Sequence, residues 1–123
     1  MKKIVILNFD KKAKKRLQEV SAQVDPDFEV LEIQAPQDLD QIEDKVLCVF
    51  YFQENDHGLE SVLTDLRRAR RNIPVNVIFK KKDFQLLLEA YELPITSALG
   101  PKYTPGDLYK AMRKCELGRL RGG

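Results

Sequence analysis

Short apolar runs alternate with helical stripes along this chain of 123 residues, and this alternation constrains the fold more than any other feature. The apolar runs, rich in β-branched residues, have the length of buried strands. They predict strands over 3–9, 28–33, 46–52, 75–79 and 95–99. Apolar residues at helical spacing predict helices over 11–24, in a short stretch between Pro36 and Lys45, around Leu59–Leu66, over 83–93 and from Pro105 onward.

Strands that alternate with helices indicate right-handed crossovers and one parallel sheet covered on both faces. The run 46–52 is apolar on both faces, as expected of a central strand. The length suits one domain, which we place at 1–118, with 119–123 as a tail or the start of a linker. In such sheets ligands bind at the carboxyl ends of the strands, so we look for function there.

Composition excludes several classes of function. The net charge of +2 argues against a nucleic-acid-binding domain, since such domains are strongly basic. The longest apolar run, 46–52, is far shorter than the roughly 20 residues that span a membrane, and the apolar N-terminal stretch stops at Asn8. We therefore expect a cytoplasmic protein without a membrane partner. Cys48 and Cys115 fall at apolar positions and are predicted to be buried, reduced thiols.

Three short motifs give the chain a likeness to a known family. The first is Asp56-His57-Gly58-Leu59-Glu60, after the central strand, and the second is Ile73-Pro74-Val75, before the fourth. The third is Lys102, followed by Tyr103, Pro105 and Leu108. With these motifs the chain resembles the receiver domain of two-component response regulators. The resemblance implies a single three-layer, doubly wound α/β domain, with a five-stranded parallel sheet in the order 2-1-3-4-5 and five helices.

Counted on this resemblance, the chemistry of the family is missing. The phosphoacceptor aspartate would stand eight residues before Gly58, where the chain has Phe50. The acidic pair that holds Mg²⁺ falls on Asn8 and Phe9, and the hydroxyl residue ending the fourth strand falls on Phe79. Of this degenerate phosphorylation site, Lys102 alone keeps the family residue.

A phenyl ring offers no oxygen to a phosphoryl donor or to Mg²⁺. We expect Phe9, Phe50 and Phe79 to form a dry aromatic plug at the strand ends, and we expect no enzyme activity, no cofactor and no metal site. Asp10 is predicted to cap the first helix rather than to bind metal. Asp56 and His57 are predicted to lie in a solvated turn.

The helix predicted over 83–93 carries more apolar surface than one sheet face covers. Such patches usually contact a partner, unless neighbouring helices and loops cover them. Receiver domains use the face of the fourth helix, fifth strand and fifth helix for dimers and partners. We therefore predict a protein partner or a homodimer through a face formed by Phe84, Leu86, Leu88, Leu93 and Tyr103.

Basic clusters supply an alternative. Lys80, Lys81 and Lys82 follow the fourth strand, and Lys102 is predicted to face them, so the four form a candidate anion site. The arginines of the third helix are predicted to form a solvated face: Arg67, Arg68, Arg70 and Arg71. The prediction is a phosphorylation-independent pseudo-receiver, an interaction module in bacterial signalling or regulation. The alternative is a sensor of a phosphate-bearing metabolite or nucleotide.

Overall fold

A five-stranded parallel sheet forms the centre of the computed structural model, which describes residues 2–54, 58–80 and 95–120. The strands are β1 (Lys2–Leu7), β2 (Glu29–Ile33), β3 (Lys45–Gln53), β4 (Val75–Phe79) and β5 (Ser97–Leu99). Their order across the sheet is β2-β1-β3-β4-β5, and all neighbours pair in parallel. The predicted sheet and its order are confirmed.

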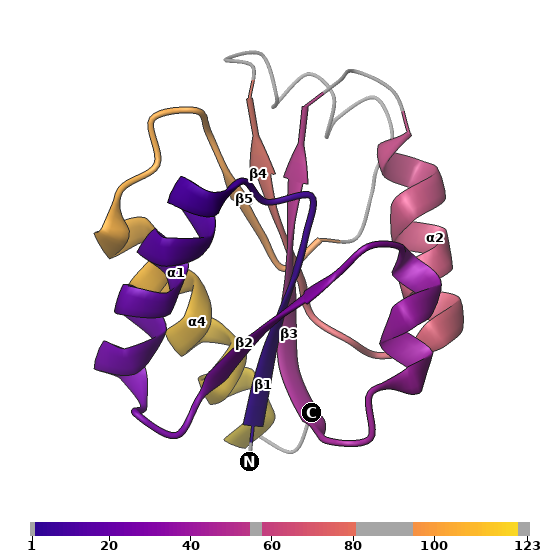
Figure 1. The fold of residues 1–123 in the computed structure, drawn as a ribbon, viewed down its shortest axis with the longest axis horizontal. Helices are drawn as coiled ribbons and strands as arrows, with labels where there is room; N and C mark the ends of the chain where they lie inside the picture. Colours follow the sequence, from indigo (N-terminus) through magenta and orange to yellow (C-terminus); the bar gives the residue numbers. More distant parts are fainter. Residues whose placement is uncertain (1, 55–57, 81–94, 121–123) are drawn as a thin grey trace.

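Helices cover both faces of this sheet (Figure 1). The described helices are α1 (Lys11–Val24), the 3-10 helix η1 (Pro36–Gln41), α2 (Leu59–Ala69) and α4 (Pro105–Leu120). Figure 1 shows α1 and α4 on one side of the sheet and α2, with the η1 segment, on the other. The three-layer arrangement is therefore confirmed. The helix predicted over 83–93 lies outside the described residues.

Two N-terminal caps fix where helices begin. Asp10 accepts a hydrogen bond from the backbone nitrogen of Ala13 at 2.7 Å and so caps α1, as predicted. At α4 the backbone nitrogen of Thr104 donates to Asp107 Oδ2 at 2.9 Å, and the backbone nitrogen of Asp107 donates to Thr104 Oγ1 at 3.2 Å. Pro105 takes the first helical position, where its missing N–H costs nothing. Caps of this kind contribute about 1 kcal/mol each.

The core consists of two apolar clusters, one on each face of the sheet. The first lies between the sheet and the pair α1 and α4, and it includes Ile4, Ile6, Leu17, Cys48, Phe50, Met112 and Cys115. The second lies toward η1 and α2, and it includes Val5, Leu39, Val49, Leu63, Val77 and Phe79. Because successive side chains of a strand point to opposite faces of the sheet, β1 and β3 contribute side chains to both clusters. Both cysteines are buried, as predicted.

Several element boundaries differ from the predicted ones. β1 stops at Leu7 rather than Phe9, because Asn8 adopts a left-handed conformation with φ of 65°. Asparagine tolerates that region better than most residues. β3 continues one residue beyond the predicted end, to Gln53. β5 is limited to Ser97–Leu99. None of the described helices is long and apolar enough to cross a membrane.

Candidate functional site

The carboxyl ends of the strands meet at one edge of the sheet, the upper edge in Figure 1. Two hydrogen bonds join neighbouring strand ends there. Asn8 Nδ2 donates to the carbonyl oxygen of Phe52 at 2.9 Å, which links β1 to β3. The backbone nitrogen of Lys80 donates to the carbonyl oxygen of Gln53 at 3.1 Å, which links β4 to β3. Asn8, Gln53 and Lys80 therefore belong to one continuous edge.

Phe50 does not lie at this edge. In the sheet register it pairs with Ile6 of β1 and Asn76 of β4, and β3 runs on from residue 51 to Gln53. Its side chain is 0% exposed and belongs to the core cluster against α1 and α4. The prediction that Phe50 ends its strand is therefore wrong. Counting eight residues back from Gly58 presumes a longer connection than the segment 54–58 that joins β3 to α2.

The predicted aromatic plug is also wrong. Phe50 and Phe79 belong to different clusters, on opposite faces of the sheet. Phe9 is half-buried at the edge and packs against the first cluster, its ring edge-on to that of Phe52 with centroids 6.0 Å apart. Edge-to-face pairs at this separation are favourable. The edge thus holds a Phe9–Phe52 pair on one face and Phe79 on the other.

Gln53 is the edge residue that the sequence analysis missed. It is 3% exposed and pairs in register with Phe79, so it occupies the strand end that Phe50 was expected to occupy. A polar residue directly after the apolar run 46–52 was the available signal. Its neutral amide has donors and an acceptor but no carboxylate oxygen with which to attack a phosphoryl group.

Carboxylates near this edge have other surroundings. Asp10 caps α1 through Oδ1. Glu54 is exposed. Burial of Tyr51 raises the pKa of its hydroxyl, and the negative charge of Glu54 raises that pKa further. Within residues 2–54, 58–80 and 95–120, no three His, Cys, Asp or Glu side chains gather closely enough to hold a metal ion. Asp56 and His57 lie outside those ranges.

The predicted anion site is described only in part. Lys80 and Lys102 are exposed beyond the ends of β4 and β5. Lys81 and Lys82 lie outside the described residues. The site remains a prediction.

The predicted interaction face is likewise described only at its border. Phe84, Leu86, Leu88 and Leu93 lie outside the described residues. Tyr103 is half-buried against the first cluster. The Arg16 guanidinium of α1 stands over its ring at 5.3 Å from the centroid, a distance at which a cation and an aromatic face attract. Tyr103 therefore packs partly inward, toward α1.

Two large apolar side chains on α4 are exposed instead. Tyr109 is 41% exposed and Leu117 is 46% exposed. Both line a hollow of about 530 Å³ together with Thr96, which precedes β5, and with Lys110, Arg113, Lys114 and Gly118. Sequence reasoning missed them, although both lie off the buried stripe of Leu108, Ala111, Met112 and Cys115. We call Tyr109, Leu117 and the three cations the α4 face.

No protein-family model matches this chain, and no match is found among curated proteins. Solved structures do match it over nearly its whole length. A response regulator receiver domain protein from Clostridium thermocellum is 13% identical, with a TM-score of 0.74, and the match covers 98% of this chain and 99% of that one. The BeF3-activated DrrB receiver domain is 15% identical with a TM-score of 0.67, covering 94% and 97%. A CheY-like response regulator from Mesorhizobium loti is 11% identical with a TM-score of 0.69, covering 93% and 98%. The chain therefore has the receiver fold.

Proposed function

We propose that this chain is a pseudo-receiver, an interaction module of bacterial signalling or regulation that works without aspartyl phosphorylation. One observation carries the proposal. At the sheet edge where receiver domains take up phosphate, Asn8 directly follows β1, and Gln53 and Phe79 end β3 and β4. None of the three has a carboxylate.

The chemistry of phosphorylation supports this reading. Phosphoryl transfer depends on metal ions to neutralise developing charge, and Mg²⁺ is bound through carboxylates. Asn8 supplies a neutral amide, whose nitrogen is already engaged with the Phe52 carbonyl. Asp10, two residues after Asn8, caps α1. Glu54, directly after Gln53, is exposed to solvent.

The α4 face supports the interaction role. Exposed Tyr109 and Leu117 supply apolar contact area, and aromatic residues are enriched at interface cores. Lys110, Arg113 and Lys114 line the same hollow, so a partner with acidic groups around an apolar centre suits it. Glu116 is the carboxylate partner of Arg113, at 2.8 Å.

A single substitution on α4 tests this role. Leu117→Glu places a carboxylate at the centre of the α4 face. Because Leu117 is already half exposed, we expect the free energy of unfolding to change by only about 0.5 kcal/mol. Self-association, measured by sedimentation velocity, or capture of a protein from native cytoplasm should be lost. Ala22→Glu, at an exposed position near the end of α1, is the matched control and should retain both. Equal association of the two variants would contradict the proposal.

A further inference from the structure

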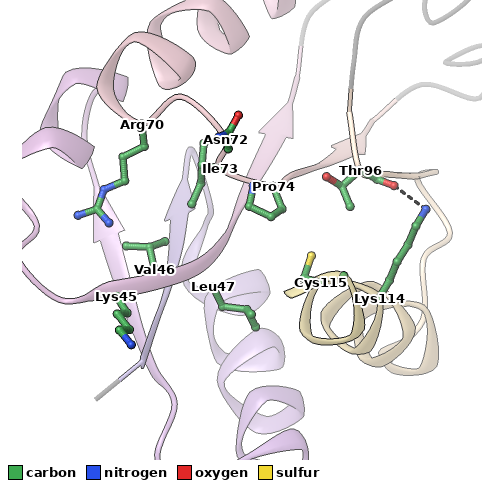
Figure 2. A pocket seen from close by; sticks show the side chains of 11 residues that line it. Lys45, Val46, Leu47, Arg70, Asn72, Ile73, Pro74, Thr96, Lys114 and Cys115 are labelled. Carbon is green, nitrogen blue, oxygen red and sulfur yellow. Dashed lines mark hydrogen bonds between the residues drawn. The ribbon is translucent and has the colours of Figure 1, made fainter. Parts of the chain in front are cut away.

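A second cavity lies at the opposite, amino-terminal edge of the sheet. Its volume is about 510 Å³, within the usual range of roughly 300–1,000 Å³ for small-molecule sites. The first residues of β3, the segment 70–74 between α2 and β4, Thr96 before β5 and the last turns of α4 surround it (Figure 2). Four separate segments of the chain thus build one concave site.

The walls combine apolar side chains with positive charge. The apolar part comes from Val46, Leu47, Ile73 and Pro74, and the cations are Lys45, Arg70 and Lys114. Among the described residues that line the cavity, none is an aspartate or a glutamate. This combination matches a ligand with an apolar body and a negative charge, since a few placed polar groups commonly orient a ligand in an apolar pocket.

Two of the cations are held in position. The Arg70 guanidinium donates to the carbonyl oxygens of Ile42 and, at 3.4 Å, Asp44. Lys114 Nζ donates to the carbonyl oxygen of Thr96 at 2.8 Å, the dashed line in Figure 2. The sequence predicted that Arg70 belongs to a solvated face. That prediction is wrong, because Arg70 is half-buried at this cavity. Cations fixed in this way lose little side-chain freedom when an anion binds.

Gly118 supplies an independent observation. It is exposed and lies in the last turn of α4. A Cβ atom at this position would meet no atom within 4 Å, so packing inside the protein does not demand a glycine here. Gly118 lines the cavity, and the missing side chain leaves room for an occupant.

The Cys115 thiol lies at the wall of this cavity, so its reactivity can reveal whether a ligand is bound. The residue is 4% exposed, yet it lines the cavity, and Figure 2 shows its sulfur directed toward the region between Leu47, Pro74 and Thr96. Asn76 Nδ2, from β4, donates to this sulfur at 3.7 Å. The hydrogen bond with Cys48 lowers the pKa of the Cys115 thiol, with contributions from Asn76 and the charge of Lys114. The same bond with Cys115, together with burial, raises the pKa of Cys48.

We propose that this cavity is a binding site for a small organic carboxylate with an aliphatic chain. The chain would lie against Val46, Leu47 and Ile73, beside Cys115. The carboxylate would lie at the end of the cavity formed by Lys45 and Arg70 (Figure 2). The site is at the opposite edge of the sheet from the degenerate phosphorylation site. The cavity adjoins the hollow at the α4 face and shares Thr96, Lys114 and Gly118 with it. The inference requires only the cavity itself and does not rest on the proposed function.

Titration of the full chain, labelled with ¹⁵N, tests this site. Sodium octanoate should shift the amide signals of Val46, Ile73 and Cys115 in a saturable way. Sodium acetate lacks the chain and octan-1-ol lacks the charge, so each should bind more weakly. The absence of a saturable octanoate shift at these residues would overturn the proposal. Equal binding of octan-1-ol would overturn the assignment of an anionic ligand.

Matched variants locate the ligand. Gly118→Leu should fill the space and weaken octanoate binding about tenfold or more, while Ala22→Leu, at the exposed position on α1, should not. Lys45→Gln should weaken binding about two- to fivefold, as expected for one exposed charge. Lys12→Gln, on α1, should leave it unchanged. Unaltered affinity in Gly118→Leu would show that octanoate binds elsewhere and would overturn the proposal.

Alkylation of the thiols gives a second readout. Iodoacetamide should modify Cys115 before Cys48, and saturating octanoate should slow modification of Cys115 at least severalfold by occupying the space beside its sulfur. Peptide mapping by mass spectrometry distinguishes the two cysteines. An unchanged rate at Cys115 under saturating octanoate would contradict binding in this cavity.

Discussion

Replacement of Phe50 by aspartate distinguishes a core residue from a strand-end residue. In receiver domains a carboxylate at the end of the central strand is functional, so an edge position would tolerate Phe50→Asp. In this protein residue 50 is 0% exposed and lies between Ile6 and Asn76 in the middle of the sheet. We therefore expect Phe50→Asp to be severely destabilising and not to create a phosphoacceptor.

The magnitude has two parts. Loss of the buried ring costs about 3–5 kcal/mol, as in Phe→Ala substitutions. The buried carboxyl group must also stay protonated in the folded state, although it ionises in the unfolded chain with a pKa of about 3.9. At pH 7 this adds about 4 kcal/mol, at 1.36 kcal/mol per pH unit. The sum, about 7–9 kcal/mol, is comparable to the whole stability of a domain, about 5–15 kcal/mol.

The second part, the free-energy cost of keeping the buried carboxyl group protonated, increases with pH. Burial raises the pKa of the introduced carboxyl group in the folded state. Between the unfolded and folded pKa values the folded state binds more protons, so the free energy of unfolding falls as pH rises. Relative to the wild type, the cost should be about 2.7 kcal/mol smaller at pH 5 than at pH 7.

Urea unfolding followed by circular dichroism at pH 5 and pH 7 measures both parts. Phe50→Leu is the control, because it removes ring volume without adding charge, and it should cost about 1–2 kcal/mol at either pH. If Phe50→Asp is already unfolded at pH 7, the pH 5 measurement still gives its stability or a lower limit to the loss. A Phe50→Asp protein of nearly wild-type stability at both pH values would refute the register argument, because residue 50 would then reach solvent.

Two further predictions concern local electrostatics. Asp10→Ala should lower the free energy of unfolding by about 1 kcal/mol, because the α1 cap is lost. Asp10→Asn should retain most of the stabilisation that the cap provides. Equal losses of stability in the two variants, measured by thermal unfolding, would contradict a capping role. The side-chain hydrogen bond to Glu29, with further attraction from the charges of Glu29 and Asp44, raises the pKa of Lys3. From neutral pH upward, the resulting stabilisation should be complete to about pH 10.4 and should be lost as pH rises through the higher folded pKa. Measured above pH 7, the stability advantage of the wild type over Lys3→Gln should therefore shrink only in that alkaline range.

Local chemistry explains why so much of the fold could be predicted. Short runs with apolar residues mark the five strands, although β5 itself, Ser97–Leu99, has no β-branched residue. Asp10 and the Thr104–Asp107 pair mark two helix starts through hydrogen bonds between near neighbours in sequence. Such signals need no knowledge of distant contacts. Strand order required the family resemblance, because periodicity alone does not say which strands are neighbours.

The candidate site was harder to predict because it depends on register. Whether Phe50 or Gln53 ends β3 is decided by pairing with β4, where Gln53 meets Phe79. A motif counted along the chain does not reveal a shorter connection between β3 and α2. The prediction that Arg70 lies on a solvated face was wrong for a related reason, because its hydrogen-bond partners, the carbonyls of Ile42 and Asp44, are distant in sequence.

Mass spectrometry of the intact protein after incubation with acetyl phosphate and Mg²⁺ shows whether any residue of this chain accepts a phosphoryl group. A receiver domain of known phosphoacceptor activity, treated in parallel, verifies the donor. The mass of this protein should stay unchanged, because Asn8, Gln53 and Phe79, which lie at the carboxyl ends of β1, β3 and β4, offer no carboxylate. Stoichiometric addition of one phosphoryl group, mapped to an aspartate, would contradict the proposed function.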